Sequence, residues 1–199
     1  MSGLKIYGRM PSRVYRTLWM AKELELEYEQ VPLHQSDGST RTPEYLAVNP
    51  NGEIPAIDDD GLVLWESMAI NLYLAKKYGG PLAPETLEEE ARATQWSFWV
   101  MSQVETPLLT VLKHRVLLPE NQRNEGLVVE KIESLQKPFH VLDSVLKKSE
   151  YLLGDRFTVA DLNVASVLRW TKMASVELLT TPDLATWLNH CLSRPAATQ

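Results

Sequence analysis

Cysteine is almost missing from this sequence, and so are the patterns that mark several large classes of protein. Cys191 is the single cysteine among 199 residues, so a disulfide scaffold and a cysteine-ligated metal site are excluded. No apolar run approaches the roughly 18 residues that a membrane-spanning helix needs. The first residues also lack the apolar core of a signal peptide. We therefore expect a cytoplasmic protein without a membrane partner.

Basic residues are also fewer than acidic ones. The 20 Lys and Arg residues are outnumbered by 26 Asp and Glu residues, which gives a formal net charge of −6 at pH 7. The excess of carboxylates is spread over both halves of the chain. Because a surface of this sign repels phosphate backbones and anionic lipids, we expect no nucleic-acid partner.

Several motifs that carry chemistry do not occur. No histidine has a second histidine four residues away, as a helical zinc site would. The glycine-rich dinucleotide fingerprint, the phosphate-binding loop and the Gly-x-Ser-x-Gly elbow are all missing. The sequence therefore predicts no metal centre and gives no support to nucleotide binding or to an esterase triad.

The first 80 residues mix strand and helix patterns. Short alternating or apolar runs predict strands at 4–7, 28–33, 54–57 and 62–65. Apolar residues at helical spacing, together with capping signals, predict helices at 13–27, 43–48 and 67–78. Three aspartates and a glycine at 58–61 indicate a hairpin turn. The predicted order is βαβ, a short helix, and then ββα.

The strand signals stop after a stretch rich in glycine and proline. We place a first domain at 1–79, a linker at 80–85 and a second domain at 86–199. The second domain consists of helix-compatible stretches at 88–118, 121–149, 158–176 and 183–193. It is predicted to be an all-helical bundle.

Two short motifs in the first domain have a possible use in binding. A proline at a strand entrance, as in Gly52-Glu53-Ile54-Pro55, can turn the amide and carbonyl of the residue before it toward an extended peptide. Glu66-Ser67 opens a helix, and a helix N-terminus is a natural seat for a carboxylate. Taken alone, Pro55 can equally well end a loop, and Glu66-Ser67 can simply cap the helix.

The combination of motifs resembles the glutathione S-transferase family over nearly the whole chain, and most closely its serine-type, theta- and phi-like bacterial members. The resemblance is carried by Tyr7-Gly8-Arg9-Met10-Pro11-Ser12 with Arg16, Thr42-Pro43-Glu44-Tyr45-Leu46, Asn49-Pro50-Asn51-Gly52-Glu53-Ile54-Pro55, Leu64-Trp65-Glu66-Ser67-Met68-Ala69-Ile70 and Thr158-Val159-Ala160-Asp161-Leu162. It implies an α+β protein, in which a thioredoxin-like βαβ-ββα domain precedes an all-helical domain. The last of these motifs is similar to a buried capping box, which concerns folding and not chemistry.

The resemblance also implies a glutathione site with glutathione as the substrate. Ile54 would pair its backbone with the cysteinyl part of glutathione, next to a cis Pro55, and Glu66 and Ser67 would hold the γ-glutamyl end. Arg41 falls where relatives place a basic residue on the glycine carboxylate, although it can also be a solvated loop charge. Glu53 stands where many members have Lys or Gln, so Arg41 or His34 would have to compensate.

The residue that stabilises the thiolate differs between classes of the family. Here Ser12 and Tyr7 are the two possibilities, and we favour Ser12 because Tyr7 lies in the strand motif, where serine-using classes have a structural tyrosine. Ser12 can also be a plain helix cap. A hydroxyl donor and the helix dipole would lower the thiol pKa from about 8.5 by the roughly two units that ionise most of it near pH 7.

The second substrate is expected to be a small apolar electrophile. The pocket for this second substrate is predicted to be lined by Met10, Pro11, His114, Trp170 and Met173. The resemblance also implies a homodimer whose interface joins the N-terminal unit of one chain to the helical unit of the other. Three other readings stay open on the same site: a glutathione-dependent peroxidase, a dehalogenase or an isomerase. A transferase-like scaffold without activity is a further alternative.

Overall fold

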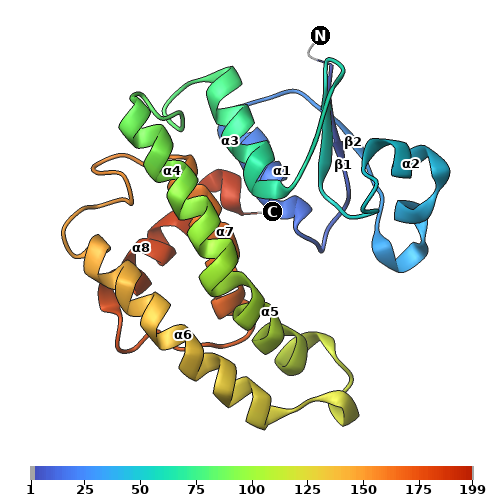
Figure 1. Ribbon diagram of the computed structural model, residues 1–199. Coiled ribbons are helices and arrows are strands. Elements are labelled where there is room, and N and C mark those ends of the chain that lie inside the picture. The colour runs from blue at the N-terminus through green and yellow to red at the C-terminus, as the bar shows by residue number, and fades with distance from the viewer. Residues whose placement is uncertain (1–2, 199) are drawn as a thin grey trace. The chain divides into compact units, whose positions relative to one another are not determined.

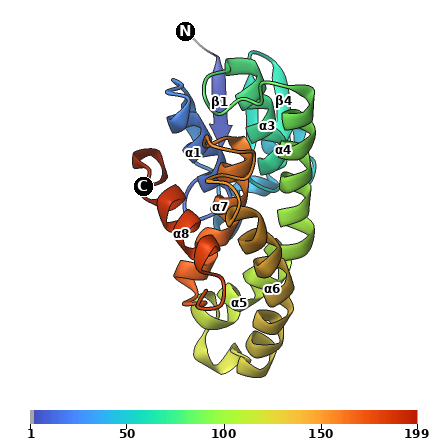
Figure 2. The ribbon, with the colours of Figure 1, turned by 90° about the vertical axis from the view of Figure 1, so that its left-hand side faces the viewer.

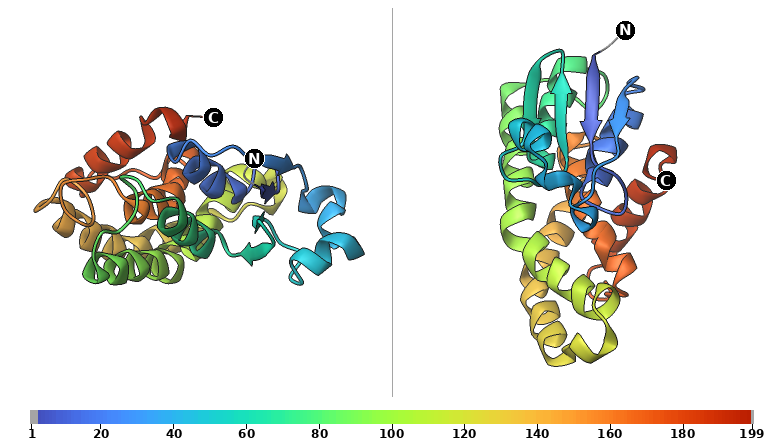
Figure 3. Two further views of the ribbon diagram at one scale, coloured as in Figure 1. Left: turned by 90° about the horizontal axis from the view of Figure 1, so that it is seen from above. Right: turned by 90° about the vertical axis from the view of Figure 1, so that its right-hand side faces the viewer.

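The computed structural model describes residues 3–198 and divides the chain into two compact units, Met1–Pro84 and Glu85–Gln199 (Figure 1). The first unit contains a four-stranded sheet of order β2-β1-β3-β4, whose strands lie side by side in Figure 3. The strands are β1 (Leu4–Tyr7), β2 (Glu29–Val31), β3 (Ala56–Asp59) and β4 (Leu62–Trp65). β2 is parallel to β1, and the other two pairings are antiparallel. This mixed sheet with its helices confirms the predicted thioredoxin-like fold.

Helices cover both faces of the sheet. α1 (Val14–Glu23) and α3 (Ser67–Tyr78) pack against each other on one side, and α2 (Pro43–Val48) lies on the other (Figure 1). Leu4 and Ile6 alternate along β1 with less buried neighbours, as a strand with one fully covered face requires. The apolar core of this unit therefore lies mainly between the sheet and the α1–α3 pair.

Several element boundaries differ from the prediction by a few residues, and two of these differences have a clear structural cause. α1 ends at Glu23 and not at residue 27, because Glu25 takes a left-handed conformation (φ 52°) and the amides of Glu25 and Leu26 bond back to the carbonyls of Lys22 and Ala21. This is the usual two-bond helix ending, made here without a glycine. β3 begins and ends two residues later than predicted, whereas β4 lies as predicted. The turn is reduced to Asp60 and Gly61, which both have positive φ, as a two-residue type I′ turn requires. Asp59 consequently belongs to the strand.

Four chain segments leave the sheet at the same end. The register places Val31, Tyr7, Ala56 and Trp65 in one row across the four strands. Beyond this row lie the loop after β1, the segment after β2, the residues that enter β3, and the start of α3 after β4. The sheet thus brings the predicted site motifs from four distant parts of the sequence together at one end of its strands.

Asp59 anchors the end of α3 to the sheet. Its buried carboxylate accepts hydrogen bonds from the hydroxyls of Tyr73 and Tyr78, both at 2.9 Å, and contacts Lys77 Nζ at 2.7 Å. Burial by itself would raise the pKa of Asp59, but the bonds from Lys77 and the two tyrosines outweigh it, so the pKa is lowered. A buried carboxylate with this many donors is fully compensated.

The second unit is all-helical, as predicted. Its first helix is continuous from 87 to 117 but twice widens into a π-helical turn: α4 (Leu87–Val100), η3 (Met101–Glu105), α5 (Thr106–Leu112) and η4 (Lys113–Leu117). The other long helices are α6 (Glu125–Leu146), α7 (Val159–Met173) and α8 (Pro182–Leu192). Pro107 has no N–H for the regular ladder, which fits the irregular turn directly before it.

α7 forms the centre of this unit (Figure 2) and contacts α4, α5 and α8. Its first turn is the predicted capping box. The Thr158 side chain accepts a hydrogen bond from the backbone of Asp161, and the Asp161 carboxylate accepts one from the backbone of Thr158. Asp161 also accepts from the Leu152 amide at 2.9 Å and from Trp187 Nε1 at 3.1 Å. Burial raises the pKa of Asp161, and these donors oppose that effect. The carboxylate therefore joins α7, α8 and the preceding loop.

Candidate active site

Ser12 lies in the loop between β1 and α1, where its hydroxyl caps the helix. Its Oγ–H donates to the Arg9 carbonyl at 2.9 Å, and Oγ accepts from the Val14 amide at 3.2 Å. The hydroxyl is thus engaged within the loop. By contrast, the peptide N–H of Ser12 makes no hydrogen bond to any of residues 3–198. Both a hydroxyl and a backbone donor are present at the start of α1.

The Ile54–Pro55 peptide bond is cis, as the resemblance implies. Within the described chain, neither the amide nor the carbonyl of Ile54 has a hydrogen-bond partner. The preceding Glu53 carbonyl is held by the hydroxyl of Tyr45 at 2.6 Å and by Asn49 Nδ2 at 2.8 Å. Burial raises the pKa of Tyr45 to about 12, so this phenol remains a donor. The backbone at Ile54 is therefore fixed on one side and open to an extended peptide.

Glu66 and Ser67 stand at the N-terminus of α3. Glu66 has φ 75° and ψ 110°, a conformation that costs a residue with a side chain about 1–3 kcal/mol. Ser67 is buried, and its Oγ accepts from Arg16 Nη1 at 3.2 Å. Because Arg16 lies one turn after Ser12 in α1, this bond fixes the two helix starts relative to each other.

Arg41 and Glu53 form an exposed pair. Arg41 Nη2 lies 3.5 Å from Glu53 Oε1, and Arg41 Nη1 donates to the Asn51 carbonyl at 2.9 Å. Gln35 Nε2 donates to the other Glu53 oxygen at 3.0 Å. A Cβ on Gly52 would lie 2.6 Å from Arg41 Nη1, so this glycine makes room for the guanidinium. Arg41 is present where predicted, but it already has a carboxylate partner.

Tyr7 lies on the side of β1 that faces α2. Its ring packs against Tyr45 with a centroid separation of 5.8 Å and joins a small apolar cluster with Ile54. Burial raises the pKa of Tyr7, with a further contribution from Asp58. These contacts favour a structural role for the ring.

Sequence analysis missed the contacts that the Ser12 loop makes with β2 and with the segment after it. Gln30 Nε2 donates to the Gly8 carbonyl at 2.8 Å, and the Arg9 guanidinium pairs with Asp37 at 3.1 Å. Hydrogen bonds from Ser39, together with Arg9, lower the pKa of Asp37 to about 2. Only the polar character of residues 35–39 hinted at this loop, and nothing in it indicated a partner.

The residues predicted for the acceptor pocket divide between the units. Met10 and Pro11 belong to the first unit, and His114, Trp170 and Met173 to the second. His114 Nδ1 accepts from the Asn124 amide at 3.2 Å, so this ring nitrogen already caps a helix start. The acceptor pocket stays a prediction.

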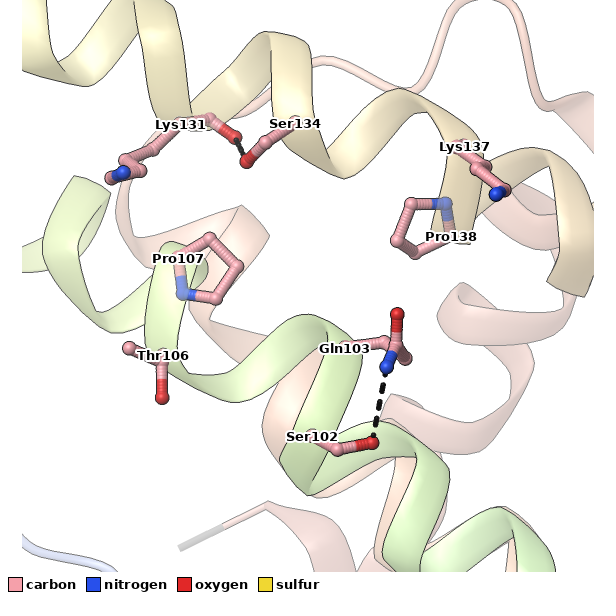
Figure 4. Close-up of a pocket in the computed structure, with 8 residues that line it drawn as sticks. All are labelled: Ser102, Gln103, Thr106, Pro107, Lys131, Ser134, Lys137 and Pro138. Atoms are coloured by element: carbon pink, nitrogen blue, oxygen red, sulfur yellow. Dashed lines mark hydrogen bonds between the residues drawn. The ribbon is translucent and has the colours of Figure 1, made fainter.

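A separate cavity of about 350 Å³ opens in the second unit between η3, α5 and α6 (Figure 4). It is lined by Ser102, Gln103, Thr106, Pro107, Lys131, Ser134, Lys137 and Pro138. None of these is a predicted site residue. As to metals, no cluster of three or more His, Cys, Asp and Glu side chains suited to an ion occurs within residues 3–198. In the same range no helix is long and apolar enough to cross a membrane.

Comparison with known proteins decides the family. Residues 2–76 match the glutathione S-transferase N-terminal domain, and residues 104–195 match the C-terminal domain. The chain belongs to the glutathione S-transferase family. It is 36% identical to a probable glutathione S-transferase of rice, over 99% of this chain and 95% of the rice protein.

Solved transferases share the fold over the full length. A theta class glutathione S-transferase from the citrus canker pathogen Xanthomonas axonopodis pv. citri, with glutathione bound, is 32% identical, with a TM-score of 0.91 over 99% of this chain and 96% of that one. Glutathione S-transferase I from maize, in complex with an atrazine glutathione conjugate, is 33% identical, with a TM-score of 0.86 over 98% and 94%. This chain is accordingly an enzyme of the glutathione transferase type.

Proposed function

We propose that this enzyme joins the thiolate of glutathione to small apolar electrophiles and that Ser12 assists thiolate formation. The observation that carries the proposal is that three features lie at the same end of the sheet. The Ser12 loop, the open backbone of Ile54 and the Glu66-Ser67 helix start all lie next to the row Val31–Tyr7–Ala56–Trp65. An extended tripeptide needs such a set, with a strand-like backbone partner in the middle and polar groups at each end.

The contacts at each position support separate roles. Ile54 offers one amide and one carbonyl to the cysteinyl part, and Ser67, oriented by Arg16, keeps its hydroxyl hydrogen for the γ-glutamyl carboxylate. Arg41 can reach the glycine carboxylate if it exchanges Glu53 for the ligand. The maize relative solved with an atrazine glutathione conjugate supports an apolar electrophile as the second substrate.

Ser12→Ala tests the assignment, with Tyr7→Phe as the matched control. We expect Ser12→Ala to raise the pKa of the bound thiol by about one to two and to lower turnover near neutral pH roughly 10- to 30-fold, with activity recovering at high pH. Tyr7→Phe should change the pKa much less. Ultraviolet titration of bound thiolate and an assay with a chlorodinitrobenzene-type acceptor measure both quantities.

Three results would contradict the proposal or a part of it. If the protein is not retained on immobilised glutathione, the ligand is wrong. If Tyr7→Phe raises the thiol pKa and Ser12→Ala does not, the tyrosine is the thiolate donor. Retention together with peroxidase, dehalogenase or isomerase turnover, and no conjugation, would keep the site and replace the reaction.

We also propose a homodimer. Support comes from the apolar side chains that β4 exposes at the edge of the sheet, where Leu62 is 44% and Trp65 40% exposed; an open apolar edge strand favours association. Leu62→Glu should shift sedimentation toward the monomer, whereas Leu179→Glu, at a residue 82% exposed in the second unit, should not. An unchanged dimer in Leu62→Glu would exclude this edge. The cytoplasmic location stays a prediction.

A further inference from the structure

His34 connects the segment after β2 to the loop that carries Ser12. Its Nδ1 accepts from Ser36, through the backbone amide at 3.2 Å and the hydroxyl at 2.7 Å, and its Nε2 lies 3.2 Å from the Pro11 carbonyl oxygen. Because a backbone N–H can only donate, Nδ1 of the neutral ring is an acceptor, and the ring proton lies on Nε2. The Pro11 carbonyl can only accept, so the second contact is a hydrogen bond from His34.

The bond to Pro11 acts on the peptide unit that ends in the amide of Ser12. This peptide is trans, since among residues 3–198 only Met10–Pro11 and Ile54–Pro55 are cis. The carbonyl and the N–H of a trans peptide point in opposite directions within one plane. A carbonyl held by His34 therefore turns the Ser12 N–H away from the 34–39 loop, and this N–H is the donor that has no partner in the described chain.

The hydroxyl of Ser12, in contrast, gives its single hydrogen to the Arg9 carbonyl. A sulfur anion at the start of α1 would thus meet the peptide N–H without any rearrangement, and the hydroxyl only after the bond to Arg9 has been broken. Helix-terminal N–H groups stabilise anions through both the hydrogen bond and the dipole.

We propose that His34 is a positioning residue for thiolate formation: by holding the Pro11 carbonyl, it aims the Ser12 peptide N–H at the glutathione sulfur, which this N–H stabilises together with the hydroxyl. This inference rests on the proposed function, because it takes the sulfur to lie beside Ser12. In this role His34 acts through the Pro11–Ser12 peptide and not on the sulfur directly.

Three variants separate this role from general loop stability. His34→Phe removes the donor to Pro11, His34→Gln keeps a side-chain N–H, and Ser36→Ala removes only a hydroxyl on Nδ1 while the backbone donor stays. We expect His34→Phe to raise the pKa of the bound thiol by about one and to lower kcat near neutral pH roughly five- to tenfold, since one pKa unit is a tenfold change in the thiolate equilibrium. His34→Gln should recover most of this loss, and Ser36→Ala should match the parent enzyme.

Comparison with Ser12→Ala makes the two proposals separable. If Ser12→Ala raises the thiol pKa and His34→Phe leaves it unchanged, with glutathione still bound, the role of His34 is refuted and the role of Ser12 stands. If only His34→Phe raises it, the hydroxyl is dispensable and the peptide N–H is the donor. An equal shift in Ser36→Ala would also refute the inference, because it would point to the loop as a whole. If His34→Phe does not fold, His34→Asn, whose amide is too short to reach Pro11, replaces it with the same expectations.

Discussion

Replacing Glu66 by glycine should strengthen the fold while it weakens glutathione binding. Glu66 holds φ 75° and ψ 110° in the structure, which costs about 1–3 kcal/mol for a residue with a Cβ. Glycine removes this cost but adds about 0.4–1 kcal/mol of unfolded-state entropy. The net gain in the free energy of unfolding for Glu66→Gly is therefore between about 0 and about 2.6 kcal/mol.

The binding side of the same change follows from the lost carboxylate. If Glu66 accepts a charged hydrogen bond from the γ-glutamyl end, its removal costs about 1.5–3 kcal/mol, which is roughly 10- to 150-fold in Kd. Glu66→Ala loses the same bond and keeps the strained backbone, so its affinity should fall equally, with no gain in stability. Urea unfolding and calorimetric titration of both variants measure the two effects.

Glu25 provides a control, because it has a positive φ of 52° at the end of α1 but lies outside the proposed site. Glu25→Gly should be more stable than Glu25→Ala by a similar amount, with glutathione affinity unchanged in both. If Glu66→Gly is no more stable than Glu66→Ala while the Glu25 pair behaves as expected, the backbone at Glu66 is not strained and the reasoning fails.

Three further changes test individual contacts. Asp59→Asn should lower the free energy of unfolding by about 2–4 kcal/mol near neutral pH. Because the pKa of Asp59 is lowered in the folded state, its contribution to stability is complete above the unfolded pKa of about 3.9 and is lost below it. The difference in stability from the parent protein, measured by urea titration, should therefore shrink toward low pH. Asp161→Ala removes a cap and the bond from Trp187 and should cost at least about 2 kcal/mol, with calorimetry showing unchanged glutathione affinity in the folded protein. Glu53→Gln releases Arg41 and should tighten glutathione binding about two- to fivefold, the value of an exposed ion pair; a weaker Kd would mean that Glu53 does not compete for the guanidinium.

The order of elements could be predicted from the sequence, whereas their exact limits could not. Alternation and capping residues are local signals, and they located all four strands and the long helices. The end of α1 depends on Glu25 adopting a left-handed conformation. A glycine at this position would have predicted the helix end, whereas a glutamate does not. The later end of β3 depends on a buried Asp59, which is tolerated only because Tyr73, Lys77 and Tyr78 reach it from α3.

The site, like the fold, could be predicted from the sequence only in part. The motifs around Ser12, Ile54 and Ser67 could be found by their resemblance to a family, since each is a short run of sequence. The partners of those residues are set by tertiary contacts: Arg16 reaches Ser67 over 51 positions, and His34 reaches Pro11 over 23. A local pattern carries no information about such pairs, which is why the sequence could not show that the Ser12 hydroxyl bonds to the Arg9 carbonyl. The role of Ser12 as thiolate donor stays a prediction.

The register of the sheet also determines where this protein can be modified without harm. Leu4 pairs with Asp59 and lies at the far end of the strands from the row Val31–Tyr7–Ala56–Trp65. A surface linkage or fluorescent label attached at the Asp60–Gly61 turn is therefore separated from the proposed glutathione-binding end of the sheet by the full length of the strands. Enzyme immobilised through this turn would leave the proposed glutathione-binding end of the sheet facing solution. A linkage in the 34–39 loop would instead lie beside the proposed site.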